Sequence, residues 1–250
     1  MIPENNPTAI VSPGEFLTYL NNGQCPCLPQ VKYSLMLYDY TLYKWLRDKY
    51  RAEKVSGFTT SCALINQRLL LCCGFGIGSP AAVAAAEELI AAGIKKIVSF
   101  GTAGGIAPDA GLGDVMVCNG ALKDEGTSAH YIPEGRYSYP APALATEIEG
   151  HLRKVFPELK TGKTWTTDAP YRETSEKILR FRDEGIETVE MEASALFTLG
   201  SFRNVEVAVV LVTGDLVLPE GWIPGFMNEN VVKIVEKVTS AMVESLVEIR

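Results

Sequence analysis

The run VEVAVVLVTGD at residues 205–215 constrains the fold more than any other stretch of the chain. It is far shorter than the roughly 18 consecutive apolar residues of a membrane-spanning helix. It also lacks the apolar–polar alternation of a strand with one face in water, so both faces of such a strand must be covered. The run therefore predicts an interior strand of a sheet that is packed on both sides.

Strand-like and helix-like segments alternate along the rest of the chain. The segment SPAAVAAAEELIAAG is the clearest helix, with Ser79 as its cap, Pro80 in its first turn and Gly93 as its stop. The segments on either side of Asn66 and Gln67 are typical of a hairpin. The expected strands are residues 8–12, 57–65, 68–73, 95–100, 114–119, 162–167 and 205–215, and the expected helices are residues 41–50, 79–93, 141–156, 173–181, 191–202 and 231–249.

This alternation of strands and helices predicts a largely parallel sheet with helices on both faces. No internal repeat and no low-complexity linker divides the chain, and 250 residues suffice for one sizeable core. We therefore expect a single domain over residues 1–250, with an α/β fold of three α/β/α layers around a central mixed, mostly parallel sheet.

The composition argues against several classes of protein and partner. The net charge of −7 argues against a protein that binds the phosphate backbone of nucleic acids. The N-terminal residues MIPENNPTAIV lack the apolar core of a signal peptide and no run is long enough for a membrane helix, so we expect a cytoplasmic protein. Most of the six cysteines lie in apolar runs, as reduced, buried thiols do. Cys25 and Cys27 have no second Cys or His pair at ligand spacing, so we expect no metal site.

Small residues follow the apolar run KKIVSF, in the stretch SFGTAGGI at residues 99–106. Glycines at a strand end let the backbone approach a ligand, and exposed amides beside the Thr102 hydroxyl can hold an anion. Ligands of parallel sheets gather at the carboxyl ends of strands, where Asp168 and Asp215 are also expected. The stretch therefore predicts a ligand site, with a tight connection that binds nothing as the alternative.

A dinucleotide-binding site is a rival interpretation of the same region. Gly76, Gly78 and Ala81 fit the loose fingerprint of such a site. The acidic residue expected about twenty residues further on, at the end of the next strand, is missing, because that strand ends in SFG at residues 99–101. Without this residue the fingerprint is a weak indication.

Three longer blocks resemble the signature blocks of the nucleoside phosphorylase superfamily. They are GIGSPAAVAAAEELIAAGIKKIVSFGTAGGIAPDAGLGDVMV at 76–117, VEMEASALF at 189–197 and VVLVTGD at 209–215, and the likeness spans roughly residues 8–250. The superfamily contains uridine phosphorylase, hexameric purine nucleoside phosphorylase and the methylthioadenosine nucleosidases. DEGTSAHYIPEGRYSYPA at 124–141 is closer to uridine phosphorylase, whereas GTAGGIAP and VEMEA are closer to the nucleosidases. The resemblance implies a phosphorylase-like fold, a nucleoside-sized ligand and a homo-oligomer, either a dimer or a hexamer.

A carboxylate at the sugar is the first requirement of nucleoside cleavage. The sugar becomes cationic in the transition state and electron density moves to the base, so an enzyme needs a carboxylate at the ribose and an acid at the base. The resemblance implies that Glu192 binds the 2′ and 3′ hydroxyls of the ribose and that Met191 packs on the sugar, with Glu190 in the same substrate-binding segment. Without the resemblance, Glu192 would simply complement a helix dipole.

The resemblance also implies an acid at the base. An aspartate at the position of Asp215 donates a proton to the base in the purine-cleaving members, whereas an Asp at a strand end is otherwise common as a turn or cap residue. The glutamine and arginine that read uracil in uridine phosphorylase have no obvious match, so a purine-type nucleoside is favoured. The other expected substrate-binding residues are Asp168, Tyr171 and Arg172 at the base and Thr102, Ala103 and Gly104 along the nucleoside.

The phosphate half of the site departs from the family pattern. Phosphorylases of this superfamily hold phosphate with three arginines, one of them shortly after a Gly-Asp-Pro loop, and charge-assisted contacts of this kind suit an anion. The corresponding positions are Thr18, Ser56 and Ser99. Gly14 and Thr102 are the remaining candidates for phosphate binding. The nucleosidases instead carry a water-activating glutamate near the position of Thr18, which is also absent, with Glu15 as the nearest carboxylate.

From the residues and the resemblance together we expect a pentosyltransferase of purine salvage. It is a nucleoside phosphorylase-like enzyme that cleaves the N-glycosidic bond of a nucleoside, with a purine-type nucleoside favoured over uridine. Phosphate is the acceptor and no cofactor is needed. The alternatives are a hydrolytic nucleosidase and a catalytically weak protein that binds or stores nucleosides.

Overall fold

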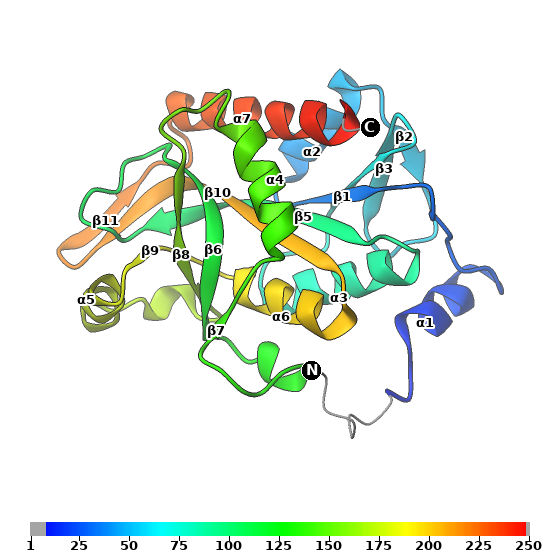
Figure 1. Ribbon diagram of the computed structural model, residues 1–250, viewed down its shortest axis with the longest axis horizontal. Helices are drawn as coiled ribbons and strands as arrows, with labels where there is room; N and C mark the ends of the chain where they lie inside the picture. Colours follow the sequence, from blue (N-terminus) through cyan, green and yellow to red (C-terminus); the bar gives the residue numbers. More distant parts are fainter. Residues whose placement is uncertain (1–8, 249–250) are drawn as a thin grey trace.

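The computed structural model describes residues 9–248 and consists of one large sheet with helices on both faces (Figure 1). The helices are α1 (Pro13–Leu20), α2 (Tyr40–Lys49), α3 (Ser79–Ala91), α4 (Pro142–Leu152), α5 (Ser175–Asp183), α6 (Ala193–Arg203) and α7 (Glu229–Glu248), with short 3₁₀ helices η1 (Ser128–His130) and η2 (Pro170–Arg172). The strands are β1 (Tyr33–Leu37), β2 (Glu53–Val55), β3 (Ser61–Ile65), β4 (Leu69–Cys73), β5 (Lys96–Gly105), β6 (Val115–Asp124), β7 (Tyr137–Ser138), β8 (Lys160–Thr167), β9 (Ile186–Glu190), β10 (Glu206–Leu218) and β11 (Gly221–Pro224).

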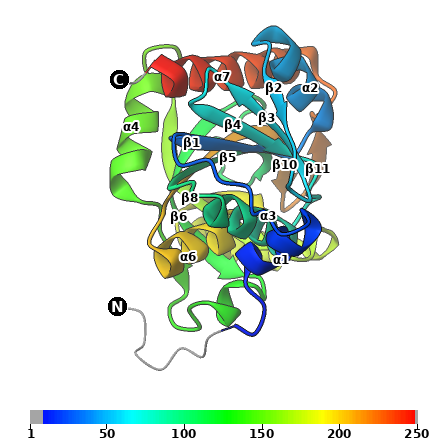
Figure 2. The same cartoon turned by 90° about the vertical axis from the view of Figure 1, so that its right-hand side faces the viewer.

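Two apolar clusters on opposite faces of the sheet establish the three layers. On one face, side chains of α2, α4 and α7, such as Leu46 and Met242, pack against strand residues that include Val210. On the other face, α3 and α6 contribute Leu89 and Leu196 to a second cluster. The view from the side shows α2 and α7 above the strands and α3 and α6 below them (Figure 2). The expected α/β class is confirmed.

The strands of the sheet pair in a mixed pattern with a closed part. β5 pairs in parallel with β10 and with β1, and β6 pairs in parallel with β8, as does β8 with β9. Antiparallel pairing joins β10 to β6 and β5 to β9, so that β5, β10, β6, β8 and β9 form a ring. β4, β3 and β2 extend the sheet beyond β1, and β11 forms a hairpin with β10. The expected mixed, partly parallel sheet is confirmed.

The run at 205–215 forms the greater part of β10, and its predicted interior place is confirmed. β10 pairs with β5 along one edge and with β6 along the other. Residues 207–215 are all buried. The run has no polar alternation because helices cover both of its faces, with α4 and α7 on one side and α6 on the other.

The N-terminal part of the chain differs from the prediction. Residue 8 of the predicted strand 8–12 lies outside the described residues, and residues 9–12 form no strand. Ser12 instead caps α1, since its Oγ accepts from the Glu15 N–H at 3.1 Å and the Glu15 carboxylate accepts from the Ser12 N–H at 2.9 Å. The first strand is β1, which sequence analysis missed; its five residues YSLML are all buried and are too few to show a periodicity.

The start of α3 also differs from the prediction. Gly78, not Ser79, is the capping residue, with a positive φ of 99° that favours glycine. Ser79 is the first helical residue, and its hydroxyl donates to the Met191 carbonyl at 2.7 Å. The predicted cap is wrong because this hydroxyl is committed to the neighbouring β9–α6 segment.

The glycine-rich stretch was predicted to lie at the end of a strand. It is instead part of the strand itself. β5 continues to Gly105 and pairs there with both β10 and β9. A Cβ on Gly104 would lie 2.6 Å from the Val217 side chain, and one on Gly105 would lie 2.9 Å from the side chains of Ala110 and Thr213. The small residues are needed because three strands converge at this point.

The other predicted elements appear near their expected places. The hairpin is β3 and β4, and Asn66 and Gln67 between them both have positive φ, near 50°. β11, which has few residues and little apolar periodicity, was not predicted. Among the described helices, none combines the length and the apolar character needed to cross a membrane.

We expect Gly105→Ala to lower the free energy of unfolding by about 1–3 kcal/mol, because the added methyl group overpacks the contact between β5 and β10. Gly150→Ala is the matched control. Gly150 lies in α4 with no atom within 4 Å of a Cβ, so this change should raise the free energy of unfolding by about 0.5–1 kcal/mol. Urea denaturation of the two variants measures both values, and equal stabilities would contradict the tight approach of the strands.

Candidate active site

A cavity of about 800 Å³ lies where β5, β9 and β10 meet. Its volume falls in the range of small-molecule sites. β5 contributes Gly101–Gly104 to its wall, and the end of β9 with the start of α6 contributes Val189–Glu192. The structure thus brings together eight of the predicted residues, namely Thr102, Ala103, Gly104, Tyr171, Glu190, Met191, Glu192 and Asp215.

Three predicted site residues lie outside this cavity. Gly14 is in α1, beside a separate shallow hollow that also contains Thr18. Asp168 accepts a hydrogen bond from the Gly126 N–H at 2.8 Å and faces a third hollow. Arg172 is exposed and does not line the cavity. These three residues are therefore not part of the cavity wall, and their contact with a ligand stays a prediction.

The prediction for Gly14 rested on a first strand at 8–12, and residues 9–12 form no strand. The segment that follows the true first strand begins with Tyr38 and Asp39, and Asp39 caps α2 by accepting from the Thr41 N–H at 2.7 Å. This segment has no arginine before Arg47. Tyr38 lines the cavity, and its hydroxyl lies 2.9 Å from the Ser99 Oγ. The first arginine of the family pattern is thus absent at the corrected position also.

Glu190 fastens the segment that carries the candidate ribose carboxylate. Its carboxylate accepts from the N–H groups of Glu192 and Ala193, both at 2.7 Å, and from the Thr166 hydroxyl at 2.6 Å. These contacts satisfy backbone donors at the start of α6 and join α6 to β8. Glu190 is buried, and its three hydrogen bonds assign it a role in positioning this segment.

Glu192 is a buried carboxyl that lines the cavity. One of its oxygens accepts from the Gly78 N–H at 2.6 Å, so the start of α3 fixes its orientation. Burial, reinforced by the charge of Glu190, raises the pKa of Glu192 to about 8. Burial also raises the pKa of Glu190, but the three hydrogen bonds stabilise its anion. Of the two, Glu192 is therefore the carboxyl that keeps its proton.

Asp215 lies in β10 immediately after a β-bulge at Gly214, where the register with β5 shifts. The Trp222 Nε1–H of the β10–β11 hairpin donates to one carboxylate oxygen of Asp215 at 2.6 Å. Burial raises the pKa of Asp215, and the Trp222 hydrogen bond partly offsets this rise. The aspartate is thus held in a fixed orientation with an increased tendency to carry a proton.

Several residues that line the cavity were not predicted from the sequence. Glu173, next to the predicted Arg172, lines the cavity, and its pKa is raised to about 7 by burial and by the charge of Asp215. Trp222 and Phe226 line the cavity from the chain after β10. Glu173 lies between Arg172 and Thr174 in no recognisable motif, and no periodicity marks the chain after β10.

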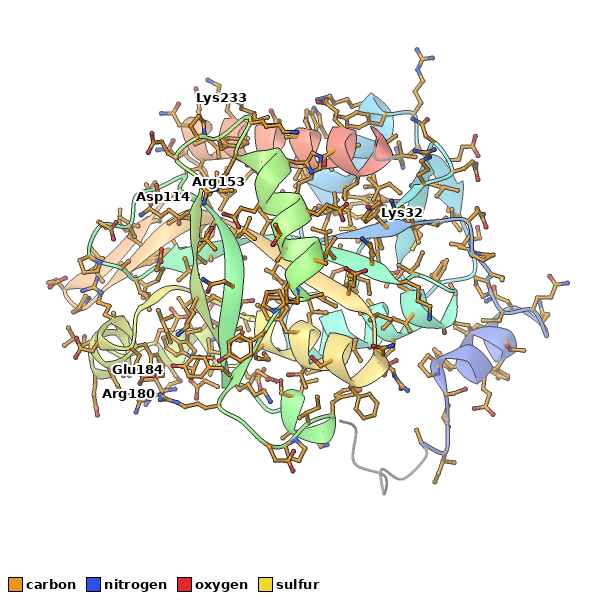
Figure 3. The ribbon with its side chains drawn as sticks, viewed as in Figure 1. Lys32, Asp114, Arg153, Arg180, Glu184 and Lys233 are labelled. Atoms are coloured by element: carbon orange, nitrogen blue, oxygen red, sulfur yellow. The ribbon has the colours of Figure 1, made fainter. Side chains whose placement is uncertain are left out.

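The cavity is acidic. Four carboxyl groups line it, those of Glu173, Glu190, Glu192 and Asp215, and none of the described residues that line it is a lysine or an arginine. Cations lie instead on the outer helices, with Arg153 at the C-terminal end of α4, Arg180 in α5 and Lys233 in α7 (Figure 3). The cavity wall can therefore bind a neutral or partly cationic group more readily than an anion.

The raised pKa of Glu192 predicts how stability depends on pH. The unfolded chain releases this proton near pH 4.5, whereas the folded chain keeps it up to about pH 8, so the free energy of unfolding falls as pH rises through this window. Each pKa unit corresponds to about 1.4 kcal/mol. We expect Glu192→Gln to exceed the native protein in stability by about 1–3 kcal/mol at pH 8 and by much less at pH 5. Denaturation of the native protein, Glu192→Gln and the exposed control Glu158→Gln across this pH range measures the effect. A difference in the free energy of unfolding between Glu192→Gln and the native protein that does not change with pH would contradict the prediction.

Comparison with known proteins agrees with this geometry. Residues 39–248 match the family model of the phosphorylase superfamily. A guanosine phosphorylase of Halorubrum lacusprofundi is 34% identical over 149 residues, which cover 59% of this chain and 62% of that protein. A uridine phosphorylase of Haemophilus influenzae is 28% identical over 170 residues, covering 61% of this chain and 66% of that protein. A DeoD-type purine nucleoside phosphorylase of Exiguobacterium sibiricum is 30% identical over 152 residues, covering 58% and 63%.

The aligned part of this chain spans about three fifths of the length of these curated relatives, whereas the family model covers most of the chain. The model match includes β5, the β9–α6 junction and β10, which together form the cavity. This chain belongs to the phosphorylase superfamily.

Proposed function

We propose that this chain is a nucleoside phosphorylase-like pentosyltransferase that cleaves the N-glycosidic bond of a purine-type nucleoside, with phosphate as acceptor. The observation that carries the proposal is the presence of Glu192 and Asp215, two buried carboxyls with raised pKa values, in one cavity of nucleoside size. Perturbed carboxyls in a cleft are typical of catalytic sites. Membership of the superfamily supports the reaction class.

In the proposed reaction the bond between C1′ of the sugar and the base nitrogen breaks, and its electron pair moves to the base. Asp215 donates a proton to the base and so compensates for this charge. Glu192 in its ionised form accepts hydrogen bonds from the ribose hydroxyls and stabilises the positive charge that develops on the sugar, and this charge in turn favours release of the Glu192 proton. A phosphate oxygen then forms the new bond to C1′, which gives a sugar 1-phosphate and the free base. No cofactor is required for these steps.

Two observations favour a purine over uridine. Asp215 supplies an acid beside Trp222 in the cavity. A purine base offers a nitrogen that can accept the proton of Asp215. The relatives include a guanosine phosphorylase and a purine nucleoside phosphorylase, although a uridine phosphorylase is also among them. These observations support a proposed role in purine salvage, and the buried free thiols favour the cytoplasm.

The proposed active unit is a homo-oligomer, a dimer or a hexamer. Large apolar side chains at the cavity, including Ile77, Tyr171 and Trp222, are 69%, 98% and 60% exposed. A second copy of the chain would cover this apolar rim and would bring further polar groups to the cavity. It could also supply the positive charge that the described lining residues lack.

A hydrolytic nucleosidase is the second candidate, and the acidic cavity wall is the observation that favours it. Water needs no cation to bind. Phosphate loses its hydration when it enters the cavity, and this is costly unless donors in the protein replace the lost water. Glu15, the carboxylate nearest the family's water-activating position, lies in α1 beside a different hollow, which weakens this candidate.

We expect cleavage of purine nucleosides by the purified protein to depend weakly on phosphate. The Thr102 and Ser99 hydroxyls and nearby amides can hold an anion, but they lack the charge of an arginine. A phosphate series with analysis of the product is the test, because phosphorolysis yields a sugar 1-phosphate and hydrolysis yields free sugar. Saturation at micromolar phosphate would show that a basic group outside the described cavity wall binds it. Nucleoside binding without any cleavage would make this a storage or binding protein.

We expect Glu192→Gln to lower kcat/KM by an amount equivalent to about 2–4 kcal/mol, as for the loss of a preorganised electrostatic contact. The amide keeps the size of the side chain and can still accept from the Gly78 N–H, so the fold is retained. Steady-state kinetics of this variant, with the exposed Glu158→Gln as control, measure the loss. Native turnover by Glu192→Gln would exclude a role at the ribose.

A further inference from the structure

Two cysteines lie directly opposite each other in the β3–β4 hairpin. Cys62 of β3 is the register partner of Cys72 of β4, and the two strands run antiparallel. Residues directly opposite in an antiparallel pair have Cα atoms about 4.5–5.5 Å apart. A disulfide bond needs a Cα separation of about 4.4–6.8 Å. The backbone therefore holds this pair at a separation that a disulfide can span without a change of register.

The side chains of the two cysteines lie on the same face of the sheet and share a neighbour. Both belong to the apolar cluster on the side of α3 and α6, and both are buried there as free thiols. The Thr60 Oγ1 lies 3.6 Å from the Cys62 Sγ and 3.4 Å from the Cys72 Sγ. The two thiols also interact with each other. The two sulfur atoms are thus already neighbours in the thiol form.

The other cysteines are placed differently. Cys73 follows Cys72 but belongs to the apolar cluster on the opposite face of the sheet, as the alternation of side chains along a strand requires. Cys118 is buried in β6, which is not a neighbour of β3 or β4 in the sheet. The two cysteines before β1 lie outside the sheet. Within residues 9–248, the β3–β4 pair is thus the one pair of cysteines that share a register position.

The two thiols of the pair differ in their tendency to ionise. The hydrogen bond with Cys72 lowers the pKa of Cys62, and Thr60 adds to this effect, although burial opposes it. The same contact and burial raise the pKa of Cys72. The thiolate is the form of cysteine that acts as a nucleophile. Cys62 is therefore the nucleophile of the pair, and Cys72 is the neighbouring thiol that can react in a second step.

A small oxidant can reach this pair from one end of the sheet. β3 and β2 are the last two strands at that end (Figure 1). β2 has three residues, and its last residue, Val55, pairs with Cys62. Thr60, beside both sulfur atoms, is half-buried and follows the exposed Thr59. Short strands at an edge open locally at a low cost in free energy, so a molecule as small as hydrogen peroxide can enter without global unfolding.

We propose that Cys62 and Cys72 are a site of reversible oxidation, at which hydrogen peroxide forms a cross-strand disulfide. The Cys62 thiolate attacks one peroxide oxygen, the O–O bond breaks, and the products are a sulfenic acid on Cys62 and hydroxide, which takes up the proton that the Cys62 thiol released. The Cys72 sulfur then attacks the sulfenic sulfur, and the Cys72 proton leaves with the sulfenic hydroxyl as water. In sum, two thiols are oxidised to one disulfide and one peroxide is reduced to two water molecules. A thiol reductant restores both thiols by exchange.

The second thiol protects Cys62 from irreversible oxidation. A sulfenic acid without a nearby thiol reacts with more peroxide to give a sulfinic acid, which thiol reductants do not reverse. The disulfide instead joins two residues that are already paired, so the register of β3 and β4 is kept. β4 leads through residues 74–77 to the Gly78 N–H that holds Glu192. Reversible oxidation therefore leaves intact the segment that positions this carboxyl.

The test treats the native protein with hydrogen peroxide and identifies the products by mass spectrometry of tryptic peptides, before and after reduction with dithiothreitol. Trypsin cleaves after Arg68 and so separates Cys62 from Cys72. We expect the two peptides to be joined with the loss of two hydrogen atoms, and dithiothreitol to release them. Fragmentation of the joined peptides distinguishes Cys72 from Cys73.

Cys72→Ala and Cys73→Ala are matched variants, because each removes one buried thiol from β4. We expect Cys73→Ala to form the cross-link as the native protein does. In Cys72→Ala, Cys62 should gain oxygen atoms that dithiothreitol does not remove. If Cys72→Ala does not fold, the native protein and Cys73→Ala decide the question.

Three results with the native protein would overturn the proposal. The first is a Cys62 that stays unmodified at a peroxide concentration that oxidises the exposed Cys27. The second is a Cys62 that gains oxygen atoms instead of forming a cross-link. The third is a cross-link from Cys62 to a cysteine other than Cys72. Each of these outcomes is read from peptide masses and is independent of whether the protein cleaves nucleosides.

Discussion

The parallel pairing of β5 with β10 is the constraint on which the site depends. It runs from Lys96 opposite Glu206 to Gly105 opposite Leu216, and it is interrupted only by the bulge at Gly214. A Cβ on Gly214 would lie 3.1 Å from the Cβ of Thr102, so the two strands approach closely where the cavity begins. β5 thus presents its backbone to the cavity and β10 presents the Asp215 carboxyl. Neither strand could shift without breaking the pairing between them.

A second set of contacts aligns Glu192, the carboxyl proposed to bind the sugar, with this pair of strands. The hydrogen bonds of Glu190 join β8, β9 and the start of α6, and the Gly78 N–H at the start of α3 holds Glu192. Four elements, β8, β9, α6 and α3, therefore fix the position of the Glu192 carboxyl. Burial of an acid in this way opposes folding near neutral pH, since the folded state must either keep a proton or hold an unsolvated charge. Stability is given up here for a preorganised group at the proposed ribose site.

The sequence was informative where a chemical group ends a strongly patterned segment. Asp215 closes the most apolar run of the chain, and Glu192 lies between a strand and a helix within a recognisable block. Glu173 and Trp222 could not be found in this way, because their proximity to Asp215 depends on a 3₁₀ turn and a hairpin without periodicity. The first strand was placed wrongly at 8–12, before Gly14, for a similar reason, since β1 is a five-residue strand whose uniform burial leaves no alternation. The small residues at 101–105 were predicted to form a ligand site, but whether they lie beyond the end of a strand or within it depended on contacts with distant residues.

The acidity of the cavity links the two halves of the proposed reaction. The four lining carboxyls cannot all be ionised together at this proximity, and the pKa values of Glu173, Glu190, Glu192 and Asp215 are all raised, chiefly by burial. A phosphate anion that enters this cavity adds negative charge and raises those pKa values further, so its binding must be accompanied by proton uptake or by a cation from outside the described wall. A sugar that becomes cationic has the opposite effect, because it favours the ionised form of Glu192. The same carboxyls that weaken the binding of phosphate thus stabilise the transition state in which the cationic sugar reacts with phosphate at C1′.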